Sequence, residues 1–507
     1  MIEINDQFKE ALTLIESRKN IFITGKAGTG KSTFLKYFLE HTRLKYVVLS
    51  PTGVAAINVG GQTIHSFFKI FPGETISDLE EIISRNKKIE LIKSLELIII
   101  DEVSMLRADL FDLINEILKK ILKNNLPFGG KQLLLIGDLY QLPPVVTTKE
   151  KELFEELYDT PYFFSANAIK EIELKIVEFE KIYRQKDEKF IEILNKIRNG
   201  TIDESDIEFI NQNCLIEKEE DDFSIYITPY NETARKINEE KLSSLKGKSY
   251  HFEGIIEGDF PLEYLPTEKD IILKKNAQVM MLVNNPEEGF VNGTIGKFQG
   301  IFEEKLKIET ENNEIIFVPP FEWTIFDYEY DRANGVITKN EIGSFYQYPV
   351  KLAWAITIHK SQGKTFKKLI LDIGKGAFSP GQIYVALSRC TSLEGLKLKK
   401  PITKKQIFID RRIINFMTQS RYIESELKNP VVEKEKLIEK AIKENKNIEI
   451  TYLKKNDEKS KRIITPKKVG TMEYASKTYK GLSGFCHKSG EERNFRLDRI
   501  LEIKILD

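Results

Sequence analysis

Cysteine is scarce in this sequence. The 507 residues include three cysteines, Cys214, Cys390 and Cys486, which lie far apart in the chain. Their spacing fits neither a disulfide framework nor a set of zinc ligands, which excludes a disulfide-stapled secreted domain and a zinc module. We therefore expect a protein of a reducing compartment, most simply the cytoplasm.

Long hydrophobic runs are also missing. Runs such as Leu97–Ile100 are far shorter than the roughly 20 apolar residues that a membrane-spanning helix needs. The first residues, Met1–Asp6, are acidic and lack the basic start of a secretory signal. These absences predict a chain that has no membrane partner.

An excess of one charge is the third absence. The chain has 77 basic and 77 acidic side chains, so its formal net charge is zero. Bulk charge therefore does not indicate a nucleic-acid partner, which would need local basic surfaces. The length of 507 residues leaves room for about three or four domains.

A complete phosphate-binding motif is present. Gly25–Ser32 matches G-x-x-x-x-G-K-[ST], between the strand-like run Ile21–Thr24 and an amphipathic helix. Glycines let the backbone turn its N–H groups toward an anion, and the helix N-terminus adds partial positive charge. Lys31 would reach the β- and γ-phosphates, and the Ser32 hydroxyl would complete a magnesium shell. The predicted contacts to a nucleoside triphosphate are Gly25, Ala27, Gly28, Thr29, Gly30, Lys31, Ser32 and Thr33.

Further polar positions belong to this predicted nucleotide site. Asp101 and Glu102 follow an apolar strand about 70 residues after the phosphate-binding loop. In enzymes with such a loop the first acid holds magnesium, and a second can orient or deprotonate the attacking water. Gln141 precedes a rigid Pro-Pro turn and is placed to sense a γ-phosphate. Gln7 could read an adenine edge or could be an ordinary surface glutamine.

A second set of polar residues follows the apolar strand Tyr46–Leu49. Small hydroxyl side chains at the carboxyl end of a parallel strand are where α/β sheets place ligand contacts. Such residues could donate to a sugar-phosphate backbone, with Phe67 or Phe68 offering a stacking face. The alternative, which we favour without other evidence, is a loop followed by a helix whose phenylalanines are core. The candidate donors are Thr52, Thr63, His65 and Ser66.

Taken in order, these motifs resemble those of superfamily 1 helicases. The Asp-Glu-Val-Ser-Met run at 101–105 and the Gly-Asp-x-x-Gln-Leu-Pro-Pro run at 137–144 are similar to the RecD-like branch. Within that branch the chain most closely resembles the petite-integration-frequency (PIF) family of 5′-to-3′ DNA helicases. The resemblance covers about residues 1–425 and implies ATP and Mg²⁺ as cofactors.

The resemblance also implies a second lobe with functional residues of its own. Arg184 and Arg389 would reach across to the γ-phosphate, and Gly363 would lie beside the nucleotide. Because both arginines belong to one lobe, ATP would close the cleft and product release would open it. The strand contacts that the resemblance implies are Thr228, Asn231, Thr357, His359 and Lys360.

The expected fold is α/β. It comprises two RecA-like P-loop domains with a small inserted wedge and an inserted SH3-like β-barrel, plus a C-terminal small β-domain. In the barrel we expect turns at Asn292-Gly293, Gly296, Gly300 and Asn312-Asn313, and a core role for the aromatic residues of 321–348. The predicted ranges are 1–170 for the first RecA-like domain with the wedge at about 62–88, 171–273 and 347–425 for the second, 274–346 for the SH3-like subdomain, 426–433 for a linker and 434–507 for the last domain.

The C-terminal tail is basic. Residues 431–507 hold 19 Lys or Arg against 13 Asp or Glu, a surplus of six. Arg493–Ile500 resembles the closing signature of the WYL domain, although Lys480 and Gly481 stand where that domain's Trp and Tyr would precede Leu482. The arginines of the tail could bind nucleic acid or could form a solvated, ion-paired face, and we favour binding.

Together these features predict an ATP-dependent 5′-to-3′ DNA helicase of replication, repair or recombination. Its expected partners are single-stranded DNA and forked or structured DNA, on which it would act as a monomer. A small-molecule kinase or GTPase would need only one P-loop domain, and no Asn-Lys-x-Asp guanine signature occurs in the chain. The nearest alternative is a translocase that moves on single strands without unwinding duplex.

Overall fold

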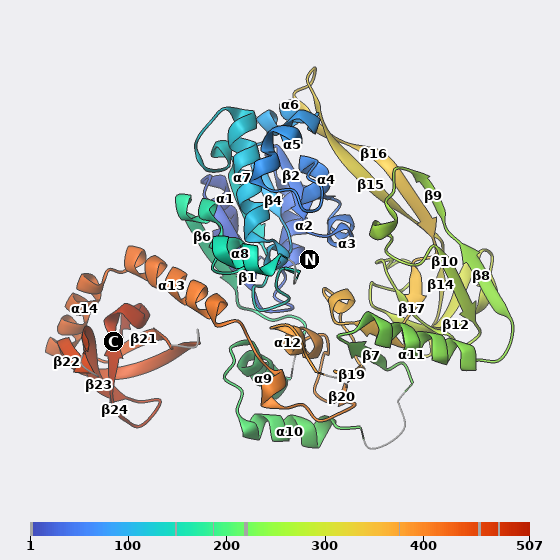
Figure 1. The fold of residues 1–507 in the computed structure, drawn as a ribbon. Coiled ribbons are helices and arrows are strands. Elements are labelled where there is room, and N and C mark those ends of the chain that lie inside the picture. Colours follow the sequence, from blue (N-terminus) through green and yellow to red (C-terminus); the bar gives the residue numbers. More distant parts are fainter. Residues whose placement is uncertain are drawn as a thin grey trace. The chain divides into compact units, whose positions relative to one another are not determined.

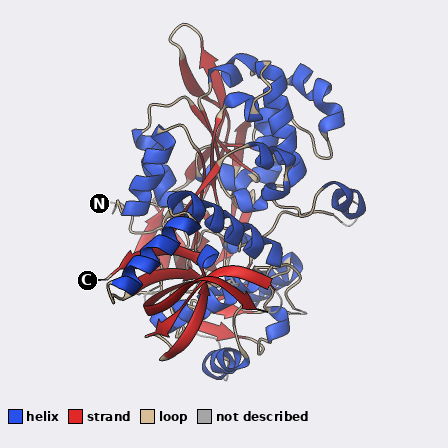
Figure 2. Ribbon diagram, turned by 90° about the vertical axis from the view of Figure 1, so that its left-hand side faces the viewer, coloured by secondary structure: helices blue, strands red, loops and turns tan. Residues whose placement is uncertain are grey.

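The computed structural model describes residues 4–147, 150–185, 187–216, 222–374, 376–454, 458–474 and 477–506. They form two compact units, residues 1–197 with 202–408 and residues 198–201 with 409–507. Helices and strands alternate through the first unit, whereas antiparallel strands dominate the end of the chain (Figures 1 and 2). The predicted α/β class is confirmed.

A six-stranded parallel sheet carries the first lobe, residues 4–185. Its strand order is β3-β2-β4-β5-β1-β6. The central strands are buried apolar runs, as a parallel sheet covered on both faces requires. Because β6 completes this sheet, the first lobe continues past the predicted boundary at residue 170. The strands are β1 Asn20–Gly25, β2 Tyr46–Ser50, β3 Gln62–Thr63, β4 Leu97–Ile100, β5 Gln132–Ile136 and β6 Leu174–Phe179.

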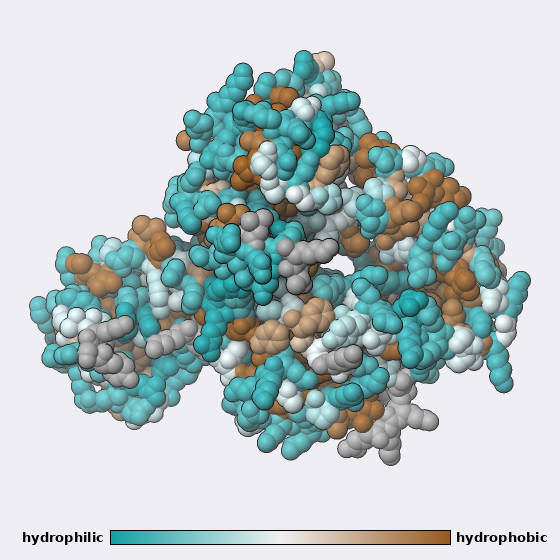
Figure 3. Space-filling view, in the orientation of Figure 1, coloured by the Kyte–Doolittle hydropathy of each residue, from teal (hydrophilic) through white to brown (hydrophobic). Residues whose placement is uncertain are grey.

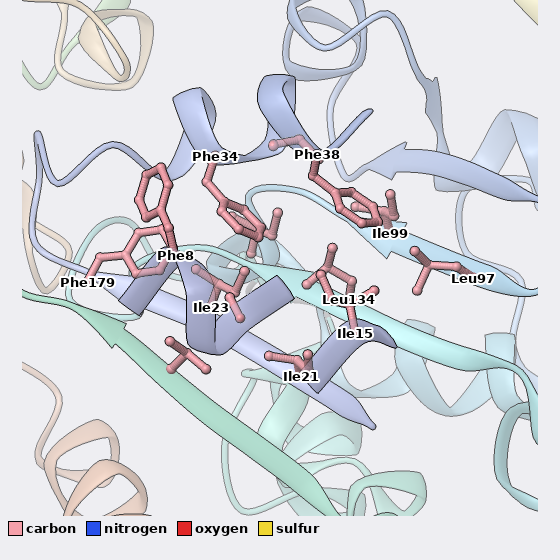
Figure 4. Packing of buried hydrophobic residues seen from close by; sticks show 14 of the residues in the cluster. Phe8, Ile15, Ile21, Ile23, Phe34, Phe38, Leu97, Ile99, Leu134 and Phe179 are labelled. Carbon is pink, nitrogen blue, oxygen red and sulfur yellow. The ribbon is translucent and has the colours of Figure 1, made fainter. Parts of the chain in front are cut away.

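An aromatic cluster fixes two helices of the first lobe on the sheet (Figure 4). Phe8 of α1 (Asp6–Glu16) packs against Phe34 of α2 (Lys31–His41) and Phe179 of β6, with ring centroids 5.3 and 4.7 Å apart. These contacts hold the start of α2 at the carboxyl end of β1, directly after the phosphate-binding loop. The other helices of the lobe are α3 Gly53–Asn58, α4 Ile64–Phe68, α5 Leu79–Arg85, α6 Ile89–Ser94, α7 Ala108–Leu122 and α8 Lys151–Leu157.

The segment expected to form a polar wedge, about 62–88, is largely packed into the first lobe. It supplies the edge strand β3, and its Phe67 and Phe68 rings are fully buried against each other at 5.0 Å. The core interpretation of these two phenylalanines is therefore confirmed, and their rings offer no stacking face. Phe71 and Ile76, by contrast, leave apolar side chains exposed.

A four-stranded parallel sheet carries the second lobe, residues 187–197, 202–248 and 353–408. Its strand order is β18-β7-β19-β20. The two lobes confirm the predicted pair of RecA-like sheets. The elements are β7 Ile225–Thr228, β18 Ala355–Thr357, β19 Leu369–Leu371, β20 Leu396–Leu398, α9 Glu188–Arg198, α10 Glu204–Cys214, α11 Asn231–Ser244 and α12 Gln382–Leu387.

Residues 249–352 form the insertion, which is built from antiparallel sheets. A two-stranded and a five-stranded sheet share one core, which includes Ile271, Val279 and Phe298. The predicted range 274–346 is too narrow, because β10 and β17 line the same core. The strands are β8 Ser249–Glu253 with β10 Asp270–Lys274, and β14 Ile315–Val318, β13 Lys305–Thr310, β12 Ile295–Phe302, β11 Gln278–Met281 and β17 Val350–Leu352.

The predicted turns of the insertion are correct only in part. Asn312 and Asn313 lie between β13 and β14, and Asn313 has a positive φ of 60°. Gly296 and Gly300 instead lie within β12, Gly300 next to a shift of register with β13. A glycine inside a strand marks a bulge or a close approach as readily as a turn, which is why this prediction was wrong for those two residues.

The longest hairpin of the insertion lies along the first lobe (Figure 1). We call residues 321–347 the docking hairpin; it comprises β15 Phe321–Asp331 and β16 Val336–Gln347, and β9 Ile255–Gly258 pairs with β16. The Val48 N–H donates to the Tyr328 hydroxyl at 3.2 Å, and the Gln62 amide donates to Asp327 at 2.7 Å. Trp323, Tyr328 and Phe345 are buried, which confirms the core prediction for them; Tyr346 is 46% exposed, so the prediction was wrong there.

The C-terminal unit is a five-stranded antiparallel sheet with two helices. The strand order is β24-β23-β22-β21-β25, and the core beneath it includes Ile438, Ile450 and Leu482. The predicted small β-domain is confirmed. The elements are α13 Arg411–Lys428, α14 Val431–Lys443, β21 Ile448–Leu453, β22 Lys459–Tyr474, β23 Lys477–Cys486, β24 Glu491–Arg496 and β25 Ile500–Ile505.

The linker expected at 426–433 is not a linker. Helix α13 continues to Lys428 and α14 starts at Val431, with Pro430 as its N-cap. The Ser425 hydroxyl donates to the Ile500 carbonyl at 3.0 Å, so α13 is bonded to β25 and belongs to the C-terminal unit rather than to the second lobe. Polar residues at helical spacing were mistaken for a linker. Among the described residues no helix is long and apolar enough to cross a membrane.

Candidate active site

A cavity of about 750 Å³ opens in the first unit, with walls from both lobes. It joins most of the predicted nucleotide contacts with the two predicted arginines. Gly25, Gln7 and Asp101 do not line it, although Gly25 and Asp101 are neighbours of lining residues. The lining residues are Phe8, Ala27, Gly28, Thr29, Gly30, Lys31, Ser32, Thr33, Glu102, Gln141, Tyr183, Arg184, Gly363, Thr365 and Arg389.

The phosphate-binding loop is shaped by close contact with the segment that carries Arg184. Gly28 has a φ of +79°, and a Cβ atom placed on it would lie 2.5 Å from the Arg184 Cβ. Only glycine fits this position without strain. The Lys31 ammonium donates to the Gly25 and Lys26 carbonyls at 2.7 and 3.0 Å. These hydrogen bonds keep the Lys31 ammonium next to the loop that would bind the phosphates.

The acid pair is buried beside this lysine. Burial, and next the charge of Glu102, raise the pKa of Asp101 to about 7. Burial also raises the pKa of Glu102, against the opposing charges of Lys31 and Arg389. Glu102 has a φ of +53°, which is strained for a residue with a side chain. A carboxylate with a raised pKa is a better proton acceptor, so this environment suits Glu102 to activate a water molecule.

The residues present fit a magnesium ion bound mainly through a nucleotide. No group of three or more His, Cys, Asp or Glu suited to a metal occurs in the described part of the chain. Asp101 and the Ser32 hydroxyl would supply oxygen ligands, the type that Mg²⁺ prefers, and phosphates and water would complete its shell. Burial and the charge of Glu102 disfavour ionised Asp101 and raise its pKa, and a bound cation would favour the ionised form.

Gln141 is anchored at the edge of the cavity. Its amide donates to Asp138 at 3.2 Å, and it is 9% exposed. Gly381 of the second lobe packs against the backbone of Gln141, because a Cβ atom on Gly381 would lie 2.4 Å from the Gln141 carbonyl oxygen. The first lobe's Gln141 and the N-terminus of α12 are therefore in direct contact.

The two arginines reach the cavity from different lobes: Arg184 follows β6 of the first lobe, and Arg389 follows α12 of the second. The expectation that both belong to one lobe was wrong. Arg389 is 1% exposed, and its guanidinium donates to the Val385 carbonyl at 2.9 Å and to the Ser388 hydroxyl at 2.8 Å. Burial, followed by repulsion from Arg184, lowers the pKa of Arg389 to about 9. The Gln185 amide donates to the Ser388 and Cys390 carbonyls at 2.9 and 3.1 Å, which ties the two arginine segments together. Two buried like charges held this close are suited to receive an anion.

Gln7 is not brought into the cavity. Its side-chain oxygen accepts a hydrogen bond from the Glu180 N–H at 3.1 Å, so it braces the backbone that follows β6. Its neighbour Phe8 lines the cavity instead, and a Cβ atom on Gly30 would lie 3.5 Å from the Phe8 ring. Contact of Gln7 with an adenine edge stays a prediction, beside the alternative of an ordinary surface glutamine.

The predicted strand contacts of the first lobe lie at the ends of β2 and β3. Thr52 and Thr63 act as N-caps, accepting from the Ala55 and Ser66 N–H groups at 3.4 and 3.2 Å. The hydroxyls of Thr63 and Tyr264 are 2.8 Å apart, and either can donate. Burial, then the charge of Arg107, lower the pKa of His65. Thr63 is therefore already engaged by the insertion.

The predicted strand contacts of the second lobe lie at the ends of β7 and β18, as expected. Thr228 and Thr357 are, however, buried, at 0% and 3% exposed. The Thr357 hydroxyl accepts from the Lys360 N–H at 3.3 Å, so it shapes the turn that presents Lys360. Asn231 and Lys360 are exposed, and His359 is half-buried with a pKa lowered by burial.

Comparison with known proteins identifies the family. Residues 3–208 match the family model described as PIF1-like helicase. The ATP-dependent DNA helicase Pif1 of Campylobacter jejuni is 32% identical over 460 residues, which cover 83% of this chain and 100% of the relative. The chain belongs to the Pif1-like helicases. The ATP-dependent DNA helicase Pif1 of Bdellovibrio bacteriovorus is 31% identical, covering 82% of this chain and 92% of the relative.

Solved structures of Pif1 have the same fold. The crystal structure of Bacteroides sp. Pif1 in complex with ADP-AlF4 matches with a TM-score of 0.76 and 37% identity, covering 82% of this chain and 96% of that chain. Bacteroides Pif1 bound to single-stranded DNA matches with a TM-score of 0.58 at the same identity and coverage. Unliganded Bacteroides sp. Pif1 matches with a TM-score of 0.75, so this Pif1-like helicase is more similar overall to the forms without DNA. Residues 434–505 match the WYL domain, which confirms the resemblance of the tail.

Several residues of the Pif1-like site were missed in the sequence. Tyr183 and Gln185 flank Arg184, so their position next to a predicted site residue could have indicated that they belong to the site. Phe8 is adjacent to Gln7, but its sequence context shows only an apolar helix pattern and does not indicate a role in the cavity. Tyr264 lies about 200 residues from Thr63 in the chain, so only the tertiary fold brings the two together.

Proposed function

We propose that this Pif1-like, ATP-dependent DNA helicase translocates 5′ to 3′ along a single strand and opens forked or structured DNA. One observation carries the mechanism: Arg389 of the second lobe enters the same cavity as Lys31 of the first, beside Arg184, which follows β6 of the first lobe. A cavity shared between two lobes couples nucleotide state to their relative position. Translocation would follow from repeated closing and opening of this cleft.

The roles within the cavity follow from its chemistry. Lys31 would bind the β- and γ-phosphates, and Glu102, with its raised pKa, would accept the proton of the attacking water. Gln141 would orient that water. Arg184 and Arg389 would stabilise the charge that develops on the γ-phosphate. Mg²⁺, held by Ser32 and Asp101, would neutralise phosphate charge when bound.

The strand contacts are proposed on both lobes. The exposed Asn231 and Lys360 and the half-buried His359 lie at the ends of neighbouring parallel strands, where α/β sheets place ligands. Thr52, Thr63, His65 and Ser66 would supply the first lobe's contacts after Tyr264 leaves Thr63. Such contacts to a sugar-phosphate backbone carry no base code, so movement would be largely independent of sequence.

Neighbouring proteins support DNA as the partner. Solved structures describe Bacteroides Pif1 bound to single-stranded DNA and the unwinding of forked duplex by two coordinating Pif1 helicases. We propose that this chain acts as a monomer on a single strand. We also propose a cytoplasmic setting, since Cys214, Cys390 and Cys486 are buried free thiols.

Two assays test the proposal. The rate of ATP hydrolysis is measured with and without single-stranded DNA, and strand displacement is then measured on duplexes with a 5′ or a 3′ overhang. We expect DNA to stimulate hydrolysis and only the 5′ overhang to support unwinding. Stimulated hydrolysis without displacement on either duplex would instead establish a translocase, and opening of the 3′ substrate would refute the proposed direction.

A further inference from the structure

The Tyr384 side chain crosses from the second lobe to the phosphate-binding loop. The Ala27 N–H donates to the Tyr384 hydroxyl at 3.1 Å, and Tyr384 is 3% exposed. Ala27 lines the nucleotide cavity, whereas Tyr384 does not. Backbone N–H groups of such a loop are the donors that receive phosphate oxygens. The Tyr384 side chain of the second lobe therefore accepts a hydrogen bond from one N–H donor of the loop and does not itself line the cavity.

Tyr384 and Arg389 are connected through α12 (Gln382–Leu387). Tyr384 lies within α12, and the Arg389 guanidinium donates back to the Val385 carbonyl of that helix at 2.9 Å. The N-terminus of α12 is fixed by Gly381, whose φ is +77° and whose Cβ position would lie 2.6 Å from the Tyr140 carbonyl oxygen. A change in the distance between Tyr384 and Ala27 must therefore also move Arg389.

The Tyr384 hydroxyl also interacts with both arginines. Negative charge on the Tyr384 oxygen raises the pKa of Arg184 and of Arg389, against the larger effect of burial, which lowers the pKa of each. The hydroxyl oxygen accepts the hydrogen bond from Ala27. The hydroxyl is thus in electrostatic reach of both arginines and in hydrogen-bond contact with the loop that Lys31 closes.

We propose that Tyr384 is a positioning residue that couples the phosphate-binding loop to Arg389 of the second lobe. Its hydroxyl fixes the loop at the distance from α12 at which Arg389 can act on the nucleotide. The inference rests on the proposed hydrolysis of ATP in this cavity and adds a residue that none of the predicted motif roles includes. Because Tyr384 lies outside the cavity, it aids the transition state through Arg389 rather than by touching ATP.

Tyr384→Phe tests this inference in the full-length protein, because it removes the hydroxyl and keeps the buried ring. We expect kcat with saturating single-stranded DNA to fall about five- to tenfold, as loss of one hydrogen bond allows. Affinity for ADP should stay within about twofold, while affinity for ADP with aluminium fluoride falls about as much as kcat. A mainly structural role would not separate these two affinities.

Tyr328→Phe is the matched control. Its hydroxyl also accepts from a buried backbone N–H, that of Val48, but it lies on the docking hairpin rather than at the cavity. We expect the control to keep kcat and both affinities. Unchanged kcat in Tyr384→Phe, or equal losses of affinity for ADP and for the analogue, would overturn the inference. Failure of the wild-type protein to hydrolyse ATP would instead refute the proposed function, so the two failures are distinct.

Should Tyr384→Phe fail to fold, Tyr384→Leu serves as the second variant, with thermal unfolding measured for both. It also lacks the hydroxyl, so we expect the same selective loss of affinity for ADP with aluminium fluoride. Retention of the wild-type ratio of the two affinities by a folded variant would contradict the role of the hydroxyl.

Discussion

Single residues at the cavity have environments that match their proposed chemistry. Lys31 is bonded to the loop that would receive phosphates, and Glu102 combines a raised pKa with a strained backbone. Strained conformations cluster at functional sites because surrounding structure must hold them in place. Arg389 is buried with a lowered pKa. Each of these residues lowers the free energy of unfolding of the empty protein, and bound nucleotide would raise it again.

Lys31→Ala and Glu102→Gln should each abolish ATP hydrolysis and leave strand binding largely intact. The reason is that both residues line the nucleotide cavity, whereas the proposed strand contacts lie at the ends of β7 and β18. Steady-state hydrolysis and fluorescence-anisotropy binding of a labelled single strand check this expectation. Normal turnover by either variant would remove that residue from the site.

Lys351 should make stability depend on pH. Burial, then repulsion from Lys364 and Lys360, lower its pKa from 10.5 to about 7, and Glu268 opposes them. Between these two values the unfolded chain binds the proton and the folded protein does not, so stability should rise with pH from about 7 to 10.

Lys351→Met should therefore unfold at a higher temperature than the wild type at pH 7, by roughly 5 °C, with the difference shrinking toward pH 10. Thermal unfolding across this range measures it, with the exposed Lys307→Met of the same insertion as control. An equal shift in both variants, or one that does not depend on pH, would contradict the assigned cause.

At the scale of elements, the docking hairpin connects the insertion to the first lobe. Lys88 pairs with Asp327 and also donates to Gln62 at 3.0 Å, although burial lowers its pKa. Figure 3 shows exposed apolar atoms over the insertion, and Ile255 and Tyr346, which are paired across strands, are 55% and 46% exposed. One side of the insertion thus binds the first lobe while another leaves an apolar surface.

Tyr264→Phe should raise the affinity for single-stranded DNA by about two- to fivefold. The variant loses the hydrogen bond to Thr63, which corresponds to about 0.5–1.5 kcal/mol, and leaves that hydroxyl available to the strand. Anisotropy titrations at fixed salt provide the measurement, with Tyr346→Phe on the exposed surface of the insertion as control. Weaker binding would show that Tyr264 itself contacts DNA.

At the scale of the whole molecule, local motifs were readable in the sequence and long-range contacts were not. The phosphate-binding loop and the acid pair each follow a strand, and the resemblance of these and later motifs to the family predicted both lobes and the two arginines. The partner of Thr63 and the extent of the insertion depend on contacts between distant segments. The helix α13 was misassigned because a polar helix and a polar linker have similar composition.

The C-terminal unit remains a predicted second binding site for nucleic acid. Arg493 pairs with Glu491, and Arg496 pairs with Asp498 at 2.6 Å, as the ion-paired alternative required. These side chains are partly exposed, so the pairs contribute little and can exchange for phosphate. Helix α13 is bonded to β25, so truncation at Pro430 would remove the strand that α13 contacts and expose that side of the helix. Point variants are therefore the better test.

Simultaneous Arg493→Ala, Arg496→Ala and Arg499→Ala should weaken binding to single-stranded DNA and leave turnover at saturating DNA within a few-fold. Each lost phosphate contact should reduce the slope of log affinity against log salt by about 0.7. Glu491→Gln with Asp498→Asn, which frees the arginines, should act in the opposite direction. Titrations that superimpose on the wild type would assign this unit to another role.

The central claim is that Arg389 of the second lobe acts on a nucleotide held by the first. Its most direct test is the DNA-stimulated rate of ATP hydrolysis by Arg389→Lys and Arg389→Ala, measured beside their affinity for ADP. We predict a loss of about 10³-fold or more in kcat for Ala and a large loss for Lys, since lysine cannot reproduce the guanidinium geometry. Affinity for ADP should change little. Turnover near the wild-type rate in either variant would contradict the account.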